Sequence, residues 1–282
     1  MKLVRIILAP ALAVVLTSGA LAQPSDWIVD PELPRPGDLF RVSLRLPAGV
    51  KTGTFEFKGH TVPGFETGGL LNGYLGVDLD IDPGKHQVGY AMGAEEGTVS
   101  VLIAEREFPS ETVTTESAPG DVDAATQTRV EREAAVLAAL WNQASVPRHW
   151  VKGFVQPAGG TLGSTFGVRR ISTGAPRPQH AGQDIVAPVG GEVFAANAGK
   201  IVLAEELFLT GNTLVIDHGI GMYTLYAYLS RLDVSTGSIV QRAERVGAIG
   251  GTGLATEPHL HWAAVVGGVY VDPMMLPGMP LR

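Results

Sequence analysis

The chain has 282 residues, of which 45% are hydrophobic and 17% are charged, so it can bury a core and is expected to fold rather than remain disordered. It contains no cysteine, which excludes disulfides as a source of stability. Its formal net charge of −7, without clusters of lysine and arginine, argues against nucleic acid or an anionic membrane surface as a partner.

Residues 1–22 have the pattern of a cleaved export signal. Two basic residues precede an apolar run over residues 6–16, and small residues follow at 20–22, just before a predicted cleavage site at Gln23. A membrane anchor is the alternative, but a spanning helix needs about 20 apolar residues, and this run is shorter and contains Pro10. We therefore expect a periplasmic or secreted protein with no stable membrane insertion. Its net charge falls from −7 to −9 on cleavage, because the signal carries two basic residues and no acid.

Residues 23–118 are predicted to form an immunoglobulin-like β-sandwich. From Trp27 to about Phe108 apolar and polar residues alternate, as they do over residues 40–46, and this period of two is typical of half-buried strands. Turns rich in proline and glycine separate the strands at short spacing. The expected structure is a small antiparallel accessory domain.

Asp78, Asp80 and Asp82 have a spacing similar to that of a calcium-binding loop. The distant glutamate of such a loop is missing, and apolar residues alternate with the three aspartates. We therefore interpret the aspartates as the solvent face of a strand that ends at the Pro83-Gly84 turn.

Residues 119–150 are predicted to form a helical connector. Val130, Leu137 and Trp141 recur with helical spacing among charged residues, and Pro147 is expected to stop the helix. An apolar stripe of this kind is more often a docking face than part of a cofactor site. We therefore expect the connector to lie against one or both β domains.

Residues 151–282 return to short strands and glycine-rich turns, and they contain the residues that suggest chemistry. His259 and His261 flank Leu260, and side chains at i and i+2 of a strand project from the same face. Both imidazoles are therefore expected to face one site. Alternating histidines alone are weak evidence, because they also occur as satisfied core pairs or as surface patches.

His180 and Asp184 strengthen that evidence. Gly182 lies between them and gives the backbone the freedom to let both side chains converge. Two histidines and one aspartate offer three protein ligands and leave a fourth tetrahedral position for water. This open arrangement is typical of catalytic rather than structural zinc.

Further motifs accompany these residues in a consistent order and spacing: Ser164 to Arg170, His180 to Asp184, Ala187 to Gly190, Gly211 to Gly219, Leu225 to Ser230, Gly250 to Gly253 and Pro258 to His261. With them, the stretch from about Gly153 to Pro277 resembles the lysostaphin-type, or LytM-like, family of zinc metallopeptidases that cut peptidoglycan cross-bridges. The resemblance implies an antiparallel β metallopeptidase domain over residues 151–282, so the whole chain is expected to be mainly β.

The resemblance also implies the roles of individual residues. His180, Asp184 and His261 would bind zinc, and His259 would be the catalytic histidine beside the metal. Zinc would lower the pKa of its bound water and polarise the scissile carbonyl, while His259 takes or relays the water's proton. The implied partners are the stem peptides of bacterial peptidoglycan.

The chain departs from the family pattern at three positions. Tyr228 stands where the family has a second catalytic histidine, and alternation along the strand is expected to point it toward the metal. A phenol with a pKa near 10 can donate a hydrogen bond to an oxyanion but cannot serve as a ready base. Gln183 and Glu257 also differ from the pattern, but neither change removes a ligand.

Two functions therefore remain open. The first is a zinc metalloendopeptidase, which we favour because the three ligands and His259 are present. The second is a catalytically degenerate protein that binds peptidoglycan or activates a partner hydrolase, and it is suggested by Tyr228 and Glu257. Release of soluble fragments from peptidoglycan would distinguish the two.

Overall fold

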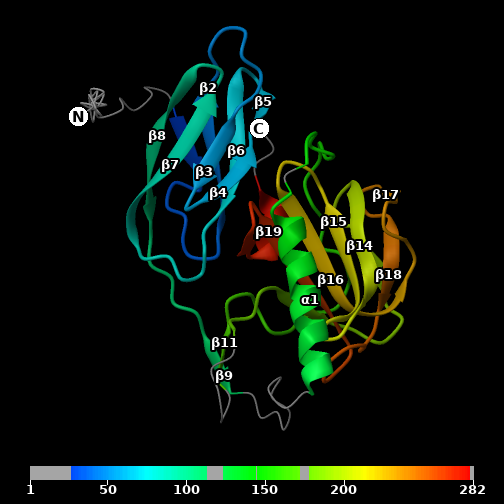
Figure 1. The fold of residues 1–282 in the computed structure, drawn as a ribbon. Helices are drawn as coiled ribbons and strands as arrows, with labels where there is room; N and C mark the ends of the chain where they lie inside the picture. Colours follow the sequence, from blue (N-terminus) through cyan, green and yellow to red (C-terminus); the bar gives the residue numbers. More distant parts are fainter. Residues whose placement is uncertain (1–26, 113–122, 144, 172–177, 280–282) are drawn as a thin grey trace, which may run out of the picture.

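The structure is a computed structural model that describes residues 27–112, 123–143, 145–171 and 178–279, so the predicted export signal lies outside the described residues. The chain is mainly β, as predicted, and two β regions lie side by side (Figure 1). Within the described ranges, no helix is both long enough and apolar enough to span a membrane.

The N-terminal region, here called the sandwich, contains two antiparallel sheets within the described residues. The first has the order β1-β2-β6-β5 and comprises β1 (Trp27–Asp30), β2 (Leu39–Arg45), β6 (Leu70–Gly76) and β5 (Phe65–Thr67). The second has the order β4-β3-β7-β8 and comprises β4 (His60–Pro63), β3 (Thr54–Phe57), β7 (Gly84–Met92) and β8 (Glu95–Ile103). Apolar side chains of both sheets share one core, in which Phe40 and Phe57 meet edge to face at 5.3 Å between ring centroids.

Strand β2 is buried on both faces, which corrects the half-buried strand predicted for residues 40–46. Phe40 belongs to the core of the sandwich, but Arg41 and Ser43 on the opposite face are buried as well. Tyr74, the cross-strand partner of Arg41, belongs to the core of the C-terminal region. The polar face of β2 is therefore covered by the second β region rather than by water.

The three predicted strand aspartates lie in the turn between β6 and β7, so the strand prediction was wrong. The backbone N–H of Asp80 donates to the carboxylate of Asp78 at 3.0 Å, which closes a local turn. The apolar residues between the aspartates still pack inward, because Val77 and Ile81 reach the core of the sandwich from this turn. The alternation therefore reflects burial without a strand.

Helix α1 (Ala124–Trp141) forms the connector. The carboxylate of Asp123 caps its start by accepting a hydrogen bond from the backbone of Thr126. Trp141, in the last turn, is buried against Tyr223 and Tyr270, at 5.4 and 6.1 Å between ring centroids. The helix therefore docks on the C-terminal sheet at its final turn, and Figure 1 shows it lying along one side of that sheet.

The C-terminal region is built on a ten-stranded antiparallel sheet in the part of the chain that the structure describes. The main path follows the order β10 (Thr161–Leu162), β12 (Gln183–Val186), β19 (His259–Val266), β16 (Met222–Leu232), β15 (Gly211–Asp217), β14 (Gly199–Leu207) and β17 (Ile239–Val240). Strand β13 (Glu192–Phe194) pairs with β18 (Arg245–Ile249), β18 also pairs with β16, and β20 (Val269–Val271) pairs with β19. The 3-10 helix η2 (Pro273–Gly278) follows.

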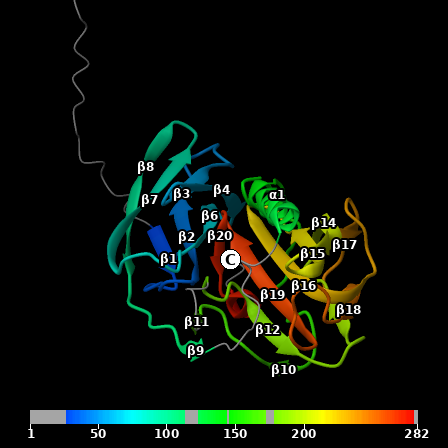
Figure 2. The same ribbon diagram turned by 60° about the horizontal axis from the view of Figure 1, so that its bottom comes forward.

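One further strand pair joins the two regions. Strand β9 (Ser110–Thr112), which follows the sandwich, runs parallel to β11 (Arg169–Ile171), which precedes β12. In Figure 2 this pair lies near the end of the C-terminal sheet that carries β12 and β10. The segment after the sandwich thus contacts the C-terminal region close to the residues predicted to bind metal.

Candidate metal centre and active site

Strands β12 and β19 are neighbours in the C-terminal sheet and carry most of the predicted site. Their antiparallel register places Asp184 directly opposite His261. On β19, His259 and His261 are partly exposed, whereas Leu260 and Trp262 are fully buried in the core. The two histidines therefore project from one face of the strand, on the side of Asp184.

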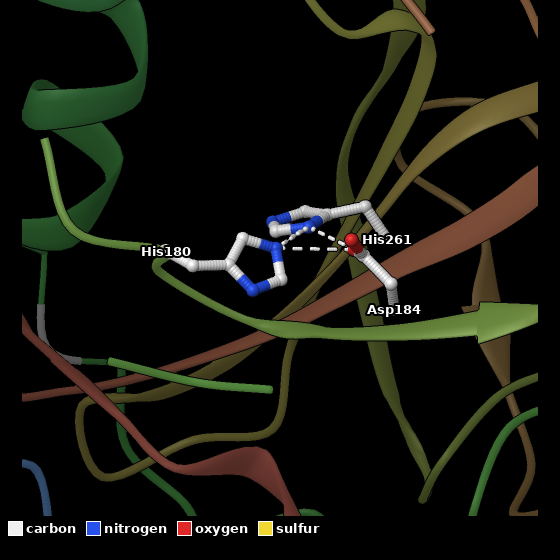
Figure 3. A group of neighbouring side chains, drawn as sticks. All are labelled: His180, Asp184 and His261. Carbon is white, nitrogen blue, oxygen red and sulfur yellow. Dashed lines mark hydrogen bonds and ion pairs between the residues drawn. The ribbon is translucent and has the colours of Figure 1, made fainter. Parts of the chain in front are cut away.

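The side chains of His180, Asp184 and His261 point toward one another (Figure 3). Nε2 of His180 lies 3.1 Å from Oδ1 of Asp184 and 3.0 Å from Nδ1 of His261. The same Nδ1 lies 2.9 Å from Oδ1 of Asp184. One atom from each residue thus contributes to a compact triangle of two ring nitrogens and one carboxylate oxygen.

The loop and strand residues before β12 hold two members of this triangle. The ring of His180 donates a hydrogen bond from Nδ1 to the carbonyl of Thr165 at 2.9 Å, which turns Nε2 toward the cluster. The backbone N–H of Asp184 donates to the carbonyl of Ser164 at 3.0 Å. The ring of His180 and the backbone of Asp184 are therefore both held by main-chain carbonyls.

Gly182 permits the close approach between β12 and β19. A Cβ at this position would lie 2.5 Å from the carbonyl oxygen of Trp262 and 2.7 Å from Cε1 of His261. The glycine thus gives space to the ring of His261, in addition to the backbone freedom expected from the sequence.

Charge in the cluster is distributed as metal binding requires. Burial alone would raise the pKa of Asp184, but the ring nitrogens of His180 and His261 beside its carboxylate hold this pKa well below its usual value. Burial and the neighbouring histidines lower the pKa of His261, and these effects outweigh the attraction of Asp184. The cluster is therefore expected to present an ionised carboxylate and a neutral His261 ring.

His259 lies beside the triangle rather than in it. Its Nδ1 donates to the carbonyl of Glu257 at 2.8 Å, so in the neutral ring the lone pair lies on Nε2. This Nε2 lies 3.8 Å from Oδ1 of Asp184. An imidazole with a free nitrogen next to the cluster is suited to accept a proton there. The exposed residue Glu257 contributes its main chain to this arrangement.

Tyr228 also faces the cluster, but for a different reason from the predicted alternation. Strand β16 has one extra residue between Tyr226 and Leu229 relative to its partner β15, and Tyr228 adopts a left-handed conformation with φ of 63°. Tyr226 and Leu229 both point into the core, while Tyr228 turns to the other face. Its ring lies 4.8 Å from that of His259 and 6.1 Å from that of His261.

The hydroxyl of Tyr228 remains a hydrogen-bond donor at neutral pH. Burial raises the pKa of Tyr228, and the nearby carboxylate of Asp184 raises it further, against a smaller opposite effect of Arg170. Arg170 was not assigned a role from the sequence, yet its Nη2 lies 3.7 Å from Oδ2 of Asp184. Gln183 is buried, and its amide donates to the carbonyls of Asp184 and Ser164, so it supports the main chain.

The geometry fits a tetrahedral divalent metal with one open position. Around a zinc ion with bonds of about 2.0–2.1 Å, ligand atoms lie about 3.3 Å apart, close to the distances among His180, Asp184 and His261. Two ring nitrogens and a carboxylate oxygen this close together repel one another through their lone pairs unless a proton or a cation lies among them. The two imidazoles and one carboxylate are also the donor types that zinc accepts.

An antiparallel β domain that gathers two histidines and one aspartate on one sheet face, with a further histidine beside them, has the side chains that a metal-dependent hydrolase needs. The comparison with protein families is more specific: residues 178–273 match the model of peptidase family M23. The C-terminal part of the chain is therefore a peptidase family M23 domain, as the resemblance indicated.

Two relatives and one solved structure agree with this assignment. Peptidoglycan DD-endopeptidase ShyA of Vibrio cholerae is 36% identical over 114 residues, which cover 40% of this chain and 26% of ShyA. DD-carboxypeptidase/endopeptidase Mpg of Neisseria meningitidis is 39% identical over 95 residues, which cover 34% of this chain and 22% of Mpg. A solved Pseudomonas aeruginosa protein described as a peptidase M23 is 25% identical with a TM-score of 0.71, and the match covers 87% of this chain and 95% of that one. The chain thus spans about a quarter of the curated relatives but nearly all of that structure.

Proposed function

We propose that the chain is an exported zinc metalloendopeptidase that hydrolyses the peptide cross-links of bacterial peptidoglycan. The observation that carries this proposal is the convergence of His180, Asp184 and His261 beside His259, inside the stretch that matches peptidase family M23. ShyA is named a peptidoglycan DD-endopeptidase and Mpg a DD-carboxypeptidase/endopeptidase, which supports a peptidoglycan substrate for this chain.

His180, Asp184 and His261 would hold the zinc, which when bound supplies Lewis-acid polarisation of the scissile carbonyl and of the attacking water. Nε2 of His259 would accept the proton released during the attack and return it to the leaving amine. The hydrogen bond from Nδ1 of His259 to the carbonyl of Glu257 keeps Nε2 available for this proton. No side chain of the protein needs to form a covalent bond to the substrate.

Tyr228 would donate a hydrogen bond to the negative oxygen that develops on the scissile carbonyl. Its protonated hydroxyl suits this role, because a preorganised donor in a partly buried site stabilises developing charge. A phenol cannot carry the positive charge that a histidine can, so we expect slower turnover than a histidine at this position would give.

The main test uses purified mature protein, zinc and intact peptidoglycan, with released muropeptides identified by mass spectrometry. We expect release by the wild type, faster release by Tyr228→His, and none by His180→Ala. The matched control is His149→Ala, which removes an exposed histidine outside the cluster.

The same experiment separates the proposal from its alternative, a degenerate module that binds peptidoglycan or activates a partner hydrolase. Tyr228 in place of a histidine is the observation that favours the alternative. If the wild type releases nothing and only Tyr228→His does, the enzyme proposal fails and the alternative stands. If His180→Ala cleaves as well as the wild type, the metal assignment is wrong.

Metal content tests the ligand set independently of activity. Mass spectrometry of the purified protein should find close to one zinc per chain in the wild type and in His149→Ala, and little in His261→Ala. Unchanged zinc in His261→Ala would remove this residue from the proposed set.

The proposed export has its own measurement. In a cell that expresses the full chain, the protein in the periplasm or medium should begin at Gln23, as determined by the mass of its N-terminal peptide. An intact chain retained in the cytoplasm would contradict the predicted signal over residues 1–22.

A further inference from the structure

Three side chains form a line of charge that ends at the metal cluster. Nε of Arg170 donates a hydrogen bond to Oε1 of Glu111 at 3.0 Å, and Nη2 of the same guanidinium lies 3.7 Å from Oδ2 of Asp184. The hydroxyl of Ser164 donates to the same Glu111 oxygen at 3.4 Å. The two oxygens of Asp184 are therefore used differently: Oδ1 faces the histidines and Oδ2 faces Arg170.

Glu111 comes from outside the stretch that matches the peptidase family. It lies on β9, which follows the sandwich, and the parallel register with β11 places it directly opposite Arg170. A backbone hydrogen bond from Arg169 to the carbonyl of Pro109, at 2.9 Å, extends this pairing. The position of Glu111 is thus fixed by strand pairing.

The residues between β10 and β11 connect β9 to the metal ligands. The backbone N–H of Gly167 donates to the carbonyl of His180 at 2.7 Å, and that of His180 donates to the carbonyl of Val168 at 3.0 Å. Together with the contacts of Thr165 and Ser164 described above, these bonds connect this segment to both His180 and Asp184. Arg170 therefore extends from a backbone that is already fixed relative to Asp184.

A carboxylate near a divalent cation can bind it through one oxygen or through both. A guanidinium at ion-pair distance from Oδ2 favours binding through Oδ1 alone, because its positive charge attracts the second oxygen and repels a cation on that side. The side chain of Arg170 is 32% exposed, so without a partner it would gain rotamer freedom in solvent. The carboxylate of Glu111 restricts that freedom.

We propose that Arg170 and Glu111 are positioning residues of the metal centre: Glu111 holds Arg170 against Oδ2 of Asp184, so that Asp184 binds zinc through Oδ1 only. This inference rests on the proposed zinc function. It gives the segment after the sandwich a defined task in the peptidase site. One-oxygen binding by Asp184 leaves the fourth tetrahedral position to water.

The test measures zinc affinity of the full mature chain by competition with a chromogenic chelator. We expect Arg170→Met to weaken zinc binding about 10–100-fold, which is typical for the loss of a residue that orients a metal ligand. Loss of a positive charge near a cation would by itself strengthen binding. The control Arg169→Met removes the same charge from the exposed neighbouring residue on β11 and should leave affinity unchanged or slightly higher.

Glu111→Gln should weaken zinc binding in the same direction but less, with Glu107→Gln in the same segment as its control. In the Arg170→Met background, Glu111→Gln should have little further effect, because Glu111 acts through Arg170. Zinc-edge X-ray absorption should show one additional oxygen at the metal in Arg170→Met. Arg170→Lys, which retains a cation of similar reach, should restore part of the affinity.

Two results would overturn the inference: zinc affinity of Arg170→Met equal to that of Arg169→Met, or additive effects of Glu111→Gln and Arg170→Met. Because the readout is zinc binding, it is independent of hydrolysis. A wild type that binds zinc tightly but releases no muropeptides would contradict the proposed enzyme and leave this inference standing. Normal hydrolysis with unchanged zinc affinity in the Arg170 and Glu111 variants would contradict this inference alone.

Discussion

Tyr228 presents a neutral hydroxyl beside His259, where burial and Asp184 raise its pKa. Tyr228→Phe retains the ring contact with His259 and removes only the hydroxyl. We expect kcat to fall about 10²–10³-fold with little change in KM, since the lost hydrogen bond would form mainly in the transition state. Steady-state hydrolysis of a synthetic cross-linked peptide by the zinc-loaded enzyme measures both constants.

The matched control for this prediction is Tyr90→Phe, which removes a hydroxyl on β7 of the sandwich. It should leave both constants unchanged. A Tyr228→Phe variant with the kcat of the wild type would show that the hydroxyl takes no part in the rate-determining step. Zinc content of each variant must match the wild type for this comparison.

Gly182 is the second residue whose replacement has a defined consequence. In Gly182→Ala the new methyl would meet the main chain of Trp262 and the ring of His261, and the main chain of a central strand cannot swing away. We expect loss of zinc occupancy and a destabilisation of about 1–3 kcal/mol from overpacking. Zinc per chain and thermal unfolding of the metal-free protein measure the two effects.

Gly251→Ala provides the comparison for that variant, because a Cβ at Gly251 would meet nothing within 4 Å and its φ is not in the left-handed region. It should retain full zinc occupancy. Stoichiometric zinc in Gly182→Ala would mean that β12 and β19 can separate enough to accept a methyl group without disturbing the cluster.

At the level of strands, features within one strand could be predicted from the sequence, whereas features that depend on how strands pair could not. The shared face of His259 and His261 follows from the period of two within β19, so the sequence alone was sufficient. The sequence predicted that Tyr228 faces the cluster, but it did so from a regular alternation of side chains. The bulge in β16 interrupts that alternation. A bulge depends on the register of neighbouring strands, which no local pattern contains. The pairing of β9 with β11, and with it the contact between Glu111 and Arg170, is non-local in the same way.

Strands β15 and β16 also enclose a polar network that makes stability depend on pH. His218, the residue after β15, is fully buried, donates from Nδ1 to the carbonyl of Ala198 at 2.8 Å, and accepts from the hydroxyl of Thr224 at 2.7 Å. That hydroxyl is in turn hydrogen-bonded to the hydroxyl of Tyr226 at 2.9 Å. Burial lowers the pKa of His218 from 6.5 to about 4. The folded protein therefore holds His218 neutral where an unfolded chain would bind a proton.

The sign of the effect follows from proton uptake. Between pH 6.5 and about 4 the unfolded chain binds the proton more readily, so the free energy of unfolding falls as the pH falls through this window. The full loss is about 3 kcal/mol once the pH is below the folded pKa. Urea unfolding of the metal-free wild type between pH 7.5 and 4.5 should show this decrease, and His218→Gln should show less of it. Equal slopes in both proteins would contradict the assignment to His218.

Over the whole molecule, the sandwich and the C-terminal region share a core. Leu39 and Tyr74 come from the sandwich but belong to the core that holds Trp262. The ring of Tyr74 lies 5.8 Å from that of Trp150, and a Cβ at Gly76 would lie 2.9 Å from side-chain carbons of β20. The sequence therefore predicted the strands of the sandwich but not its packing against the C-terminal region. The apolar residues that join the two regions lie among polar residues on β2 and β6.

Arg106 reinforces the shared core with charge. Its guanidinium contacts the carboxylate of Asp38 at 2.9 Å and that of Asp272 at 3.4 Å, so one side chain bridges the sandwich and the start of η2. The backbone N–H of Asp272 also donates to the carbonyl of Gly37 at 2.8 Å. Apolar packing and partly buried polar contacts therefore act across the same boundary, as they do inside a single domain.

We accordingly expect the two regions to unfold together. Calorimetry of the metal-free protein should give one transition whose calorimetric and van't Hoff enthalpies agree. Tyr74→Ala should lower the free energy of unfolding by about 3 kcal/mol, because it empties a fully buried site at the boundary. Hydrogen exchange should then accelerate in β2 and in β16 alike, whereas Tyr90→Phe in the sandwich should change neither. Two separate transitions, or faster exchange confined to β2 in Tyr74→Ala, would mean that the sandwich unfolds independently and that β9 holds Glu111 at the metal centre without its support.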